Sequence, residues 1–400
     1  MAHTQSLPQR GDAASRFTVL MLWVLLAVFV VYPLVRLLAM AFTVDGSFTL
    51  ENLRPFVESW YDRQAAVNSI LLGCSVGVAG TVLGFIFAFA VTRLSLPKWL
   101  CTAVSAVTLL PLISPPFTSS IALTLSLGPN GILLDFFGLG NFNFYGFWGT
   151  FISETLTFFP VAFMTLSTIL ARIDPNLEDA AYSLGASSFK VFRTVTLPLA
   201  APGIANAFLL VFSCSLADFA TPQVLGGHSF PVLPTQAYLV ITGMYDFKGG
   251  AALSFMLLIP AIIVYSLQRW WVGKKSYVTV SGKAGGRSSV KGPGPLLSSV
   301  IVATVAVVIA FILYLYAIIL TGSLVKVWGV NNEITLENYS YVFTHGSKAI
   351  KDTLLIACIG TPLGGLLAVL VGYATARLKV RGSRILETVS LLNYTLPGTV

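Results

Sequence analysis

Long uncharged apolar stretches recur along the chain and set its expected architecture. A bilayer core about 30 Å thick is crossed by roughly 20 consecutive apolar residues in a helix. Only the fourth of the long stretches holds an acid, Glu154. We therefore predict an all-α, polytopic transmembrane helical bundle, with spans at 17–35, 68–92, 99–127, 146–171, 194–217, 249–268, 295–325 and 353–376. A ninth stretch, 388–400, is too short to cross, so we expect the sequence to stop inside a helix of a longer protein.

The composition agrees with a lipid-covered chain. Of the 400 residues, 56% are hydrophobic and 10% are charged, whereas soluble domains carry about 25% charged residues. If the N-terminus lies in the cytoplasm, 17 of the 24 Lys and Arg fall in the intervening cytoplasmic segments, as the positive-inside rule requires. The net charge of +8 then reflects membrane topology, and we expect no nucleic-acid partner. The predicted location is the bacterial inner membrane, with a cytoplasmic N-terminus.

The chain divides at a segment rich in Gly, Ser and Lys. We predict a first six-helix unit at 1–272, a cytoplasmic linker at 273–295 and the start of a second unit at 296–400. The two units look alike, because the sequence Thr-Leu-Glu-Asn at 49–52 recurs at 335–338. Each copy follows one long apolar helix and precedes a span that ends in Arg-Leu. The sequence thus indicates an internal duplication with a parallel repeat, whose pseudo-twofold axis runs along the membrane normal.

The stretch 173–203 has the pattern of a helical hairpin too short to cross the membrane. Asp174 is a suitable N-cap residue. Leu177, Ala180, Ala181 and Leu184 form one apolar face, and Gly185 supplies a stop. A second short helix is expected from about 187, with Phe189, Phe192 and Val195 on one side and Pro198 near its end. From spacing alone, the hairpin either docks a partner or lies on the membrane or on the chain's own helices.

This stretch resembles the EAA loop of the permeases of ATP-binding-cassette (ABC) importers, and the fused duplicated units resemble the ferric-iron branch of that family. The resemblance rests on Asp179-Ala180-Ala181, Gly185 and Leu197-Pro198, with Asp179 where the family usually has Glu. It implies the type I (MetI-like) permease fold, in which this loop docks in a groove of a cytoplasmic ATPase. The implied coupling residues are Glu178, Asp179, Ala180, Ala181, Gly185, Phe189, Leu197 and Pro198. The family's second EAA loop is absent from these 400 residues.

The resemblance also implies the partners: a cytoplasmic ABC ATPase in two copies, a periplasmic substrate-binding protein and the lipid bilayer. We expect no enzymatic activity, no catalytic residues and no cofactor bound by this chain, because 282–289 lacks the Lys and the strand–helix context of a phosphate-binding loop. ATP is used by the partner subunit. Ferric iron is the favoured substrate. Thiamine, 2-aminoethylphosphonate and polyamines remain alternatives, as does an ion-coupled secondary transporter.

Three ionisable residues fall at membrane depth. Arg36 lies near a helix end, where its side chain can reach the interface. Glu154 and Asp218 are candidates for the translocation pathway. Glu154 can instead pair with another helix, and Asp218 can cap one. The scattered His and Cys residues show no metal-ligand spacing, so we expect no resident metal.

Overall fold

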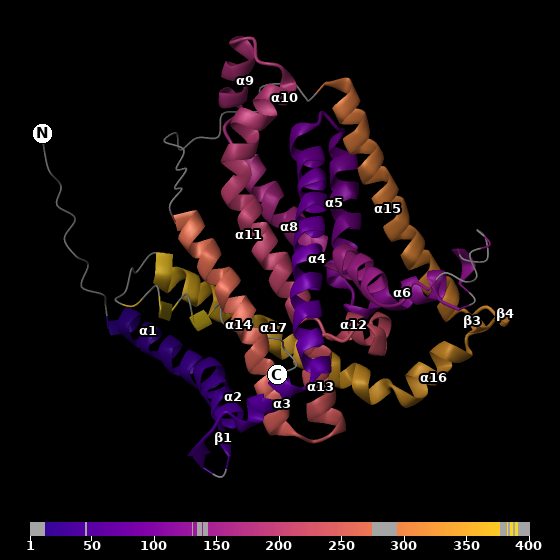
Figure 1. The fold of residues 1–400 in the computed structure, drawn as a ribbon. Coiled ribbons are helices and arrows are strands. Elements are labelled where there is room, and N and C mark those ends of the chain that lie inside the picture. The colour runs from indigo at the N-terminus through magenta and orange to yellow at the C-terminus, as the bar shows by residue number, and fades with distance from the viewer. Residues whose placement is uncertain are drawn as a thin grey trace, which may run out of the picture.

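The computed structural model describes residues 13–44, 46–129, 131–133, 138, 143–273, 294–376, 382, 385–386 and 389–390. These residues form long helices with two small antiparallel hairpins, which confirms the all-α prediction (Figure 1). The hairpins pair β1 (Thr43–Val44) with β2 (Ser47–Phe48) and β3 (Val325–Val327) with β4 (Asn331–Ile334). The helices of six or more residues are α1 (Ala13–Leu26), α2 (Tyr32–Phe42), α4 (Trp60–Arg93), α5 (Lys98–Ile113), α6 (Phe117–Leu127), α8 (Phe147–Arg172), α9 (Pro175–Ser183), α11 (Leu197–Ala217), α12 (Ala220–Leu225), α13 (Leu233–Gly243), α14 (Phe247–Gly273), α15 (Pro295–Ser323), α16 (Glu337–His345) and α17 (Ser347–Ala376).

Shorter helical pieces complete these elements. They are the π-helical turns η1 (Ala27–Val31) and η3 (Phe192–Thr196), the 3₁₀ turns η2 (Glu51–Leu53) and η4 (Gly227–Ser229), and the short helices α3 (Arg54–Glu58) and α10 (Ser188–Val191). Each π-turn lies just before a proline, Pro33 or Pro198, in the helix that follows it. Proline removes a backbone donor, and a local π-turn lets a helix continue through it.

Seven helices in the described part of the chain are long and apolar enough to cross a membrane, and they coincide with seven of the eight predicted spans. The remaining predicted span, over 99–127, is apolar enough to cross a membrane but is broken in the middle. That segment forms two helices, α5 and α6, which meet at an angle of 97°. The break falls at Ser114-Pro115-Pro116, where Ser114 is extended with ψ 153°. Proline disfavours a helical conformation in the residue before it, so consecutive prolines end α5.

Small residues on α4 bring the central helices into close contact. A Cβ atom at Gly84 would lie 2.6 Å from the Cβ of Ala162 on α8, and one at Gly77 would lie 2.7 Å from the ring of Phe208 on α11. The buried rings of Phe87 and Phe159 meet edge to face, with centroids 5.2 Å apart. Helices α4, α8 and α11 therefore form a core in which larger side chains have no room.

The structure gives the repeated Thr-Leu-Glu-Asn sequence the same local geometry in both copies. The hydroxyls of Thr49 and Thr335 each accept the N–H two residues later, at 3.1 Å. The amide of Asn52 donates to backbone carbonyls at the end of α2, the shortest contact being 3.0 Å. The amide of Asn338 does the same at the end of α15, at 3.0 and 3.1 Å. Both motifs thus cap a membrane helix and join it to the next one, as expected for a duplication.

The first helix of each unit packs on the other unit. Helix α15 lies against α4, α5 and α6 (Figure 1). Tyr316 and Tyr314 of α15 hydrogen bond to Ser114 at 2.5 Å and to Ser126 at 2.9 Å. In the opposite direction, Leu22 and Leu26 of α1 and Val30 of η1 cluster with residues of α17. The α2 part of the same span packs instead on α14, so only the α1 end of this span reaches the second predicted unit.

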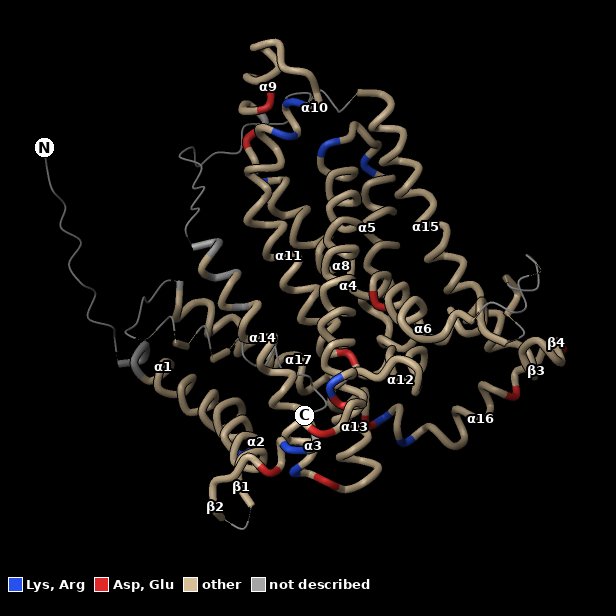
Figure 2. Tube along the Cα trace, in the orientation of Figure 1, with Lys and Arg blue, Asp and Glu red and all other residues tan. Residues whose placement is uncertain are grey.

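Charge is distributed unequally between the two ends of the bundle. Both β-hairpins lie at the end opposite α9 (Figure 1). Lys and Arg outnumber Asp and Glu around α9 and α10, whereas the two signs are mixed at the hairpin end (Figure 2). The predicted linker, 273–295, and the ninth apolar stretch lie almost entirely outside the described residues, so the predicted domain boundaries stay predictions.

Candidate functional site

The predicted hairpin is present and projects from one end of the bundle (Figure 1). The Asp174 carboxylate accepts the N–H of Asn176 at 3.0 Å and caps α9, as its position in the sequence predicted. The chain then turns at Gly185. Ser187 caps α10 in the same way, accepting the N–H of Lys190 at 3.4 Å. Local side chains thus define the start of both helices in the hairpin.

Gly185 has the left-handed conformation expected of a helix-ending glycine, with φ +81°. Its N–H donates to the carbonyl of Tyr182 at 3.0 Å, and the next N–H, of Ala186, donates to the carbonyl of Ala181 at 3.1 Å. These two bonds make a Schellman motif, which satisfies the last carbonyls of α9. No other atom lies within 4 Å of the place where a Cβ would stand. The requirement for glycine is therefore one of backbone conformation and not of space.

The expectation that the second helix ends near Pro198 is wrong. Residues 188–217 form one continuous helical rod, made of α10, the π-turn η3 and α11. Pro198 lies in the first turn of α11. Proline lacks a backbone N–H donor, and the π-turn before it lets the helix continue without that hydrogen bond. The hairpin is consequently a direct extension of a membrane-spanning helix, and a displacement of its tip has a rigid path into the membrane.

Large apolar side chains are exposed on the outer surface of the hairpin. Leu184 is 88% exposed, Phe189 is 66% exposed and Leu177 is 44% exposed. Ala180 and Pro198 are also exposed, and Leu197 is 36% exposed, whereas Asp179 and Ala181 are half-buried. The predicted alignment of Phe189 with Phe192 is wrong, because Phe192 turns inward against the rings of Phe85 and Phe89.

Glu178 points away from this exposed surface. Only 4% of the residue is exposed. Its Oε1 atom accepts the hydroxyl proton of Thr196 at 2.8 Å and lies 3.3 Å from Nη2 of Arg93, the last residue of α4. Glu178, one of the coupling residues that the resemblance implies, therefore lies inside the hairpin and not on its exposed surface. Sequence reasoning missed Arg93 as its partner, because a basic residue at the end of an apolar span is common.

The two candidate pathway acids are enclosed. Glu154 of α8 is fully buried and accepts the hydroxyl proton of Ser215 of α11. Asp218 is 8% exposed and accepts the N–H groups of Ala220 and Thr221 at 2.9 and 3.4 Å, so it caps α12. The alternatives of helix pairing for Glu154 and capping for Asp218 thus both have direct contacts. No cluster of three or more metal-ligating side chains occurs among the described residues.

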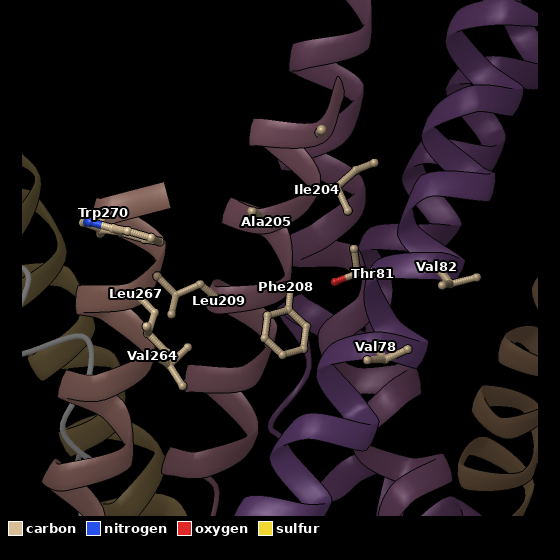
Figure 3. Close-up of a pocket in the computed structure, with 11 residues that line it drawn as sticks. Val78, Thr81, Val82, Ile204, Ala205, Phe208, Leu209, Val264, Leu267 and Trp270 are labelled. Carbon is tan, nitrogen blue, oxygen red and sulfur yellow. The ribbon is translucent and has the colours of Figure 1, made fainter. Parts of the chain in front are cut away.

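A groove of about 650 Å³ runs between α4, α11 and α14 (Figure 3). Aliphatic side chains and Phe208 form nearly all of its lining, with Thr81 as a polar residue and Trp270 at one end. Neither Glu154 nor Asp218 lines it. An apolar groove of this kind provides no ligands for a charged substrate. Such ligands are found instead on the two enclosed acids, which lie outside the groove.

Comparison with known proteins places the hairpin inside a family match. Residues 80–276, which contain it, match the family model described as "Binding-protein-dependent transport system inner membrane component". The chain is also 34% identical over 216 residues to the molybdenum transport system permease protein ModB of Haemophilus influenzae, covering 92% of that protein and 51% of this chain. This chain belongs to the family of binding-protein-dependent transport permeases. It is accordingly a multi-pass membrane protein of the ABC importer permease type, as the EAA-like residues indicated.

Two ferric transport permeases match almost the whole of this permease chain. It is 34% identical over 402 aligned residues to the putative ferric transport system permease protein FbpB 1 of H. influenzae, and 35% identical to FbpB of Actinobacillus pleuropneumoniae. Both alignments cover 98% of this chain, and they cover 63% and 58% of the two relatives. The chain thus spans about three fifths of the length of these relatives.

The solved structures most relevant to the fold are permease chains. Two structures of a bacterial alginate ABC transporter match with TM-scores of 0.57 and 0.58, at 16% and 15% sequence identity. They cover 66% and 67% of this chain and 96% and 97% of the matched chains. The type I permease fold is thereby confirmed for about two thirds of the permease.

Proposed function

We propose that this chain is part of the membrane channel of an ABC importer, in which a separate ATPase docks on the hairpin around Gly185. The observation that carries this proposal is the uncovered apolar surface of Leu177, Leu184 and Phe189 on a rod that continues into α11. An exposed apolar patch at the polar end of a membrane protein favours a protein partner. The basic surroundings of the hairpin favour a cytoplasmic location, with the N-terminus on the same side.

The proposed partners are two copies of the ATPase and a periplasmic binding protein that delivers the substrate. One matched alginate transporter structure contains a substrate-bound periplasmic protein, and the family description names binding-protein dependence. The chain itself is proposed to be non-enzymatic and to bind no cofactor. Its role is to open and close a path between helices while the ATPase supplies the energy.

Ferric iron is the proposed substrate, because the two relatives that align with 98% of the chain are ferric transport permeases. Relatives for molybdenum and for spermidine/putrescine align over 51% and 60% of the chain. A chain that passes ferric iron needs only transient oxygen contacts from residues such as Glu154 and Asp218, because hard cations prefer oxygen ligands.

The decisive test is uptake by the reconstituted transporter. The full-length protein, its ATPase and its binding protein are placed in liposomes, and uptake of ferric iron, molybdate, spermidine and 2-aminoethylphosphonate is compared. We expect ATP-dependent accumulation of iron alone. Accumulation of another substrate would reassign the cargo. Uptake that follows an ion gradient and persists without ATP would show a secondary transporter instead.

A further inference from the structure

The attachment of α9 to the rest of the molecule is unusual for so apolar a protein. Among the residues of α9 whose burial is described, only Glu178 is buried. The helix packs mainly against α10 and η3. Most of its apolar side chains face outward. The helix is therefore held to the bundle chiefly at a polar, directional contact and not by a broad hydrophobic interface.

That contact joins three elements that are far apart in the sequence. The Oε1 atom of Glu178 accepts the hydroxyl proton of Thr196, which lies in the π-turn η3, at 2.8 Å. The same atom lies 3.3 Å from the guanidinium of Arg93 at the end of α4. Arg93 is only 6% exposed. Helix α4 packs on both α8 and α11 in the core. Movement of Glu178 would thus act on two membrane helices at once, one through η3 and one through Arg93.

A buried ion pair is a costly way to hold a helix. Replacing both partners with apolar residues is often neutral for stability, whereas removing one leaves a buried charge alone. What the pair provides is a defined position. In this structure the Nε and Nη2 atoms of Arg93 make no aligned hydrogen bond, although Nη2 is within ion-pair distance of Glu178.

We propose that Glu178, Arg93 and Thr196 form an internal link that keeps α9 fixed to α4 and α11, so that the hairpin and the membrane helices move as one body. Glu178 and Arg93 are positioning residues, separate from the exposed docking surface. This inference rests on the proposed function, since it concerns how movement at the ATPase dock reaches the membrane.

The first test separates docking from coupling in the reconstituted transporter. Glu178→Gln keeps an acceptor for Thr196 but removes the charge that faces Arg93. We expect the ATPase to remain bound and active, while substrate uptake per ATP hydrolysed falls at least tenfold. The matched control is Glu58→Gln, which breaks an exposed 2.7 Å pair with Arg54 at the opposite end and should leave this ratio unchanged. Loss of ATPase binding by Glu178→Gln would overturn the inference, as would an unchanged ratio.

A second variant removes the problem of an unpaired buried charge. The double change Arg93→Leu with Glu178→Leu should fold, because no charge is left alone, but it should stay uncoupled. Recovery of normal coupling in this variant would show that packing alone is sufficient and would refute the link. If the parent transporter shows no ATP-driven uptake at all, the proposed function itself has failed, which is a distinct outcome.

A distance measurement reports the movement directly. Spin labels are placed at the exposed residues Ser183, on α9, and Ser95, just beyond α4, in a background whose four cysteines are replaced. In the parent, the distance between labels should stay the same when ATP is added, because α9 and α4 move together. In Glu178→Gln the distance distribution should broaden or shift. A parent distance that changes with ATP would refute the rigid link.

Discussion

Substitution of Gly185 tests whether the geometry of the hairpin determines ATPase docking. Gly185 has φ +81°, and a Cβ there would meet no neighbouring atom within 4 Å. The cost of a side chain is therefore the intrinsic cost of the left-handed conformation, about 1–2 kcal/mol for a non-glycine residue. A β-branched residue belongs at the upper end of this range, and Asn, which tolerates this region, belongs below it.

These energies translate into an expected loss of affinity. If the hairpin must hold its present turn to bind, the apparent dissociation constant rises by the factor by which the competent population falls. A cost of 1–2 kcal/mol corresponds to at most about 5- to 30-fold. Gly185→Val should therefore weaken ATPase binding by about 30-fold at most and uncouple transport, while Gly185→Asn remains close to the parent. Gly185→Ala should fall between them.

The assay is titration of the ATPase onto the permease in nanodiscs, with ATP-driven uptake measured in parallel. Membrane insertion and elution volume in detergent show whether each variant is folded. Equal affinities for the Val and Asn variants would refute the reasoning, because the two differ mainly in their tolerance of positive φ.

Three further predictions concern topology, capping and packing. Cysteine introduced at Ser183 should react with an impermeant reagent only from the cytoplasmic side and cysteine at Ser47 only from outside, and the reverse pattern would invert the orientation. Asn52→Ala should lower the free energy of unfolding by about 1–3 kcal/mol, because three carbonyl contacts lose their donor. Asn338 is exposed, so Asn338→Ala should cause a smaller loss. Thermal unfolding in detergent measures both. Gly84→Val should lower the midpoint of thermal unfolding because its Cβ meets α8 at 2.6 Å, whereas Gly364→Val on α17, with nothing within 4 Å, should change it much less.

The long apolar stretches predicted the positions of the spans well, and local residue preferences predicted the hairpin. The cap at Asp174 and the turn at Gly185 depend on adjacent residues, so their geometry can be read from sequence. The break in the third span and the helix end expected near Pro198 have another origin. The run 99–127 is continuous in hydropathy, and only Pro115-Pro116 shows that its direction changes. Pro198 indicated a helix end, but the helix continues through a π-turn that precedes this proline.

The Glu178–Arg93 contact could not be predicted from the sequence, because the two residues are 85 positions apart. The residues around each of them do not indicate the other as a partner. The resemblance implied a coupling role for Glu178, and only the packing of α9 on η3 shows that its side chain turns inward. The substrate and the partners likewise depend on surfaces and subunits outside the chain. Sequence gives the residue types available for such contacts, while their direction depends on the tertiary structure.

The packing of α1 on α17 also has a consequence for biosynthesis. Leu22 and Leu26 of α1 pack beside Ala374 of α17, about 350 residues later in the chain. Because synthesis proceeds from the N-terminus, α1 enters the membrane long before α17 exists. It is apolar on all sides, so lipid is an adequate temporary neighbour. We therefore expect the first predicted unit to assemble with α2 already packed on α14, while α1 gains its contact with α17 only after the second predicted unit has been inserted.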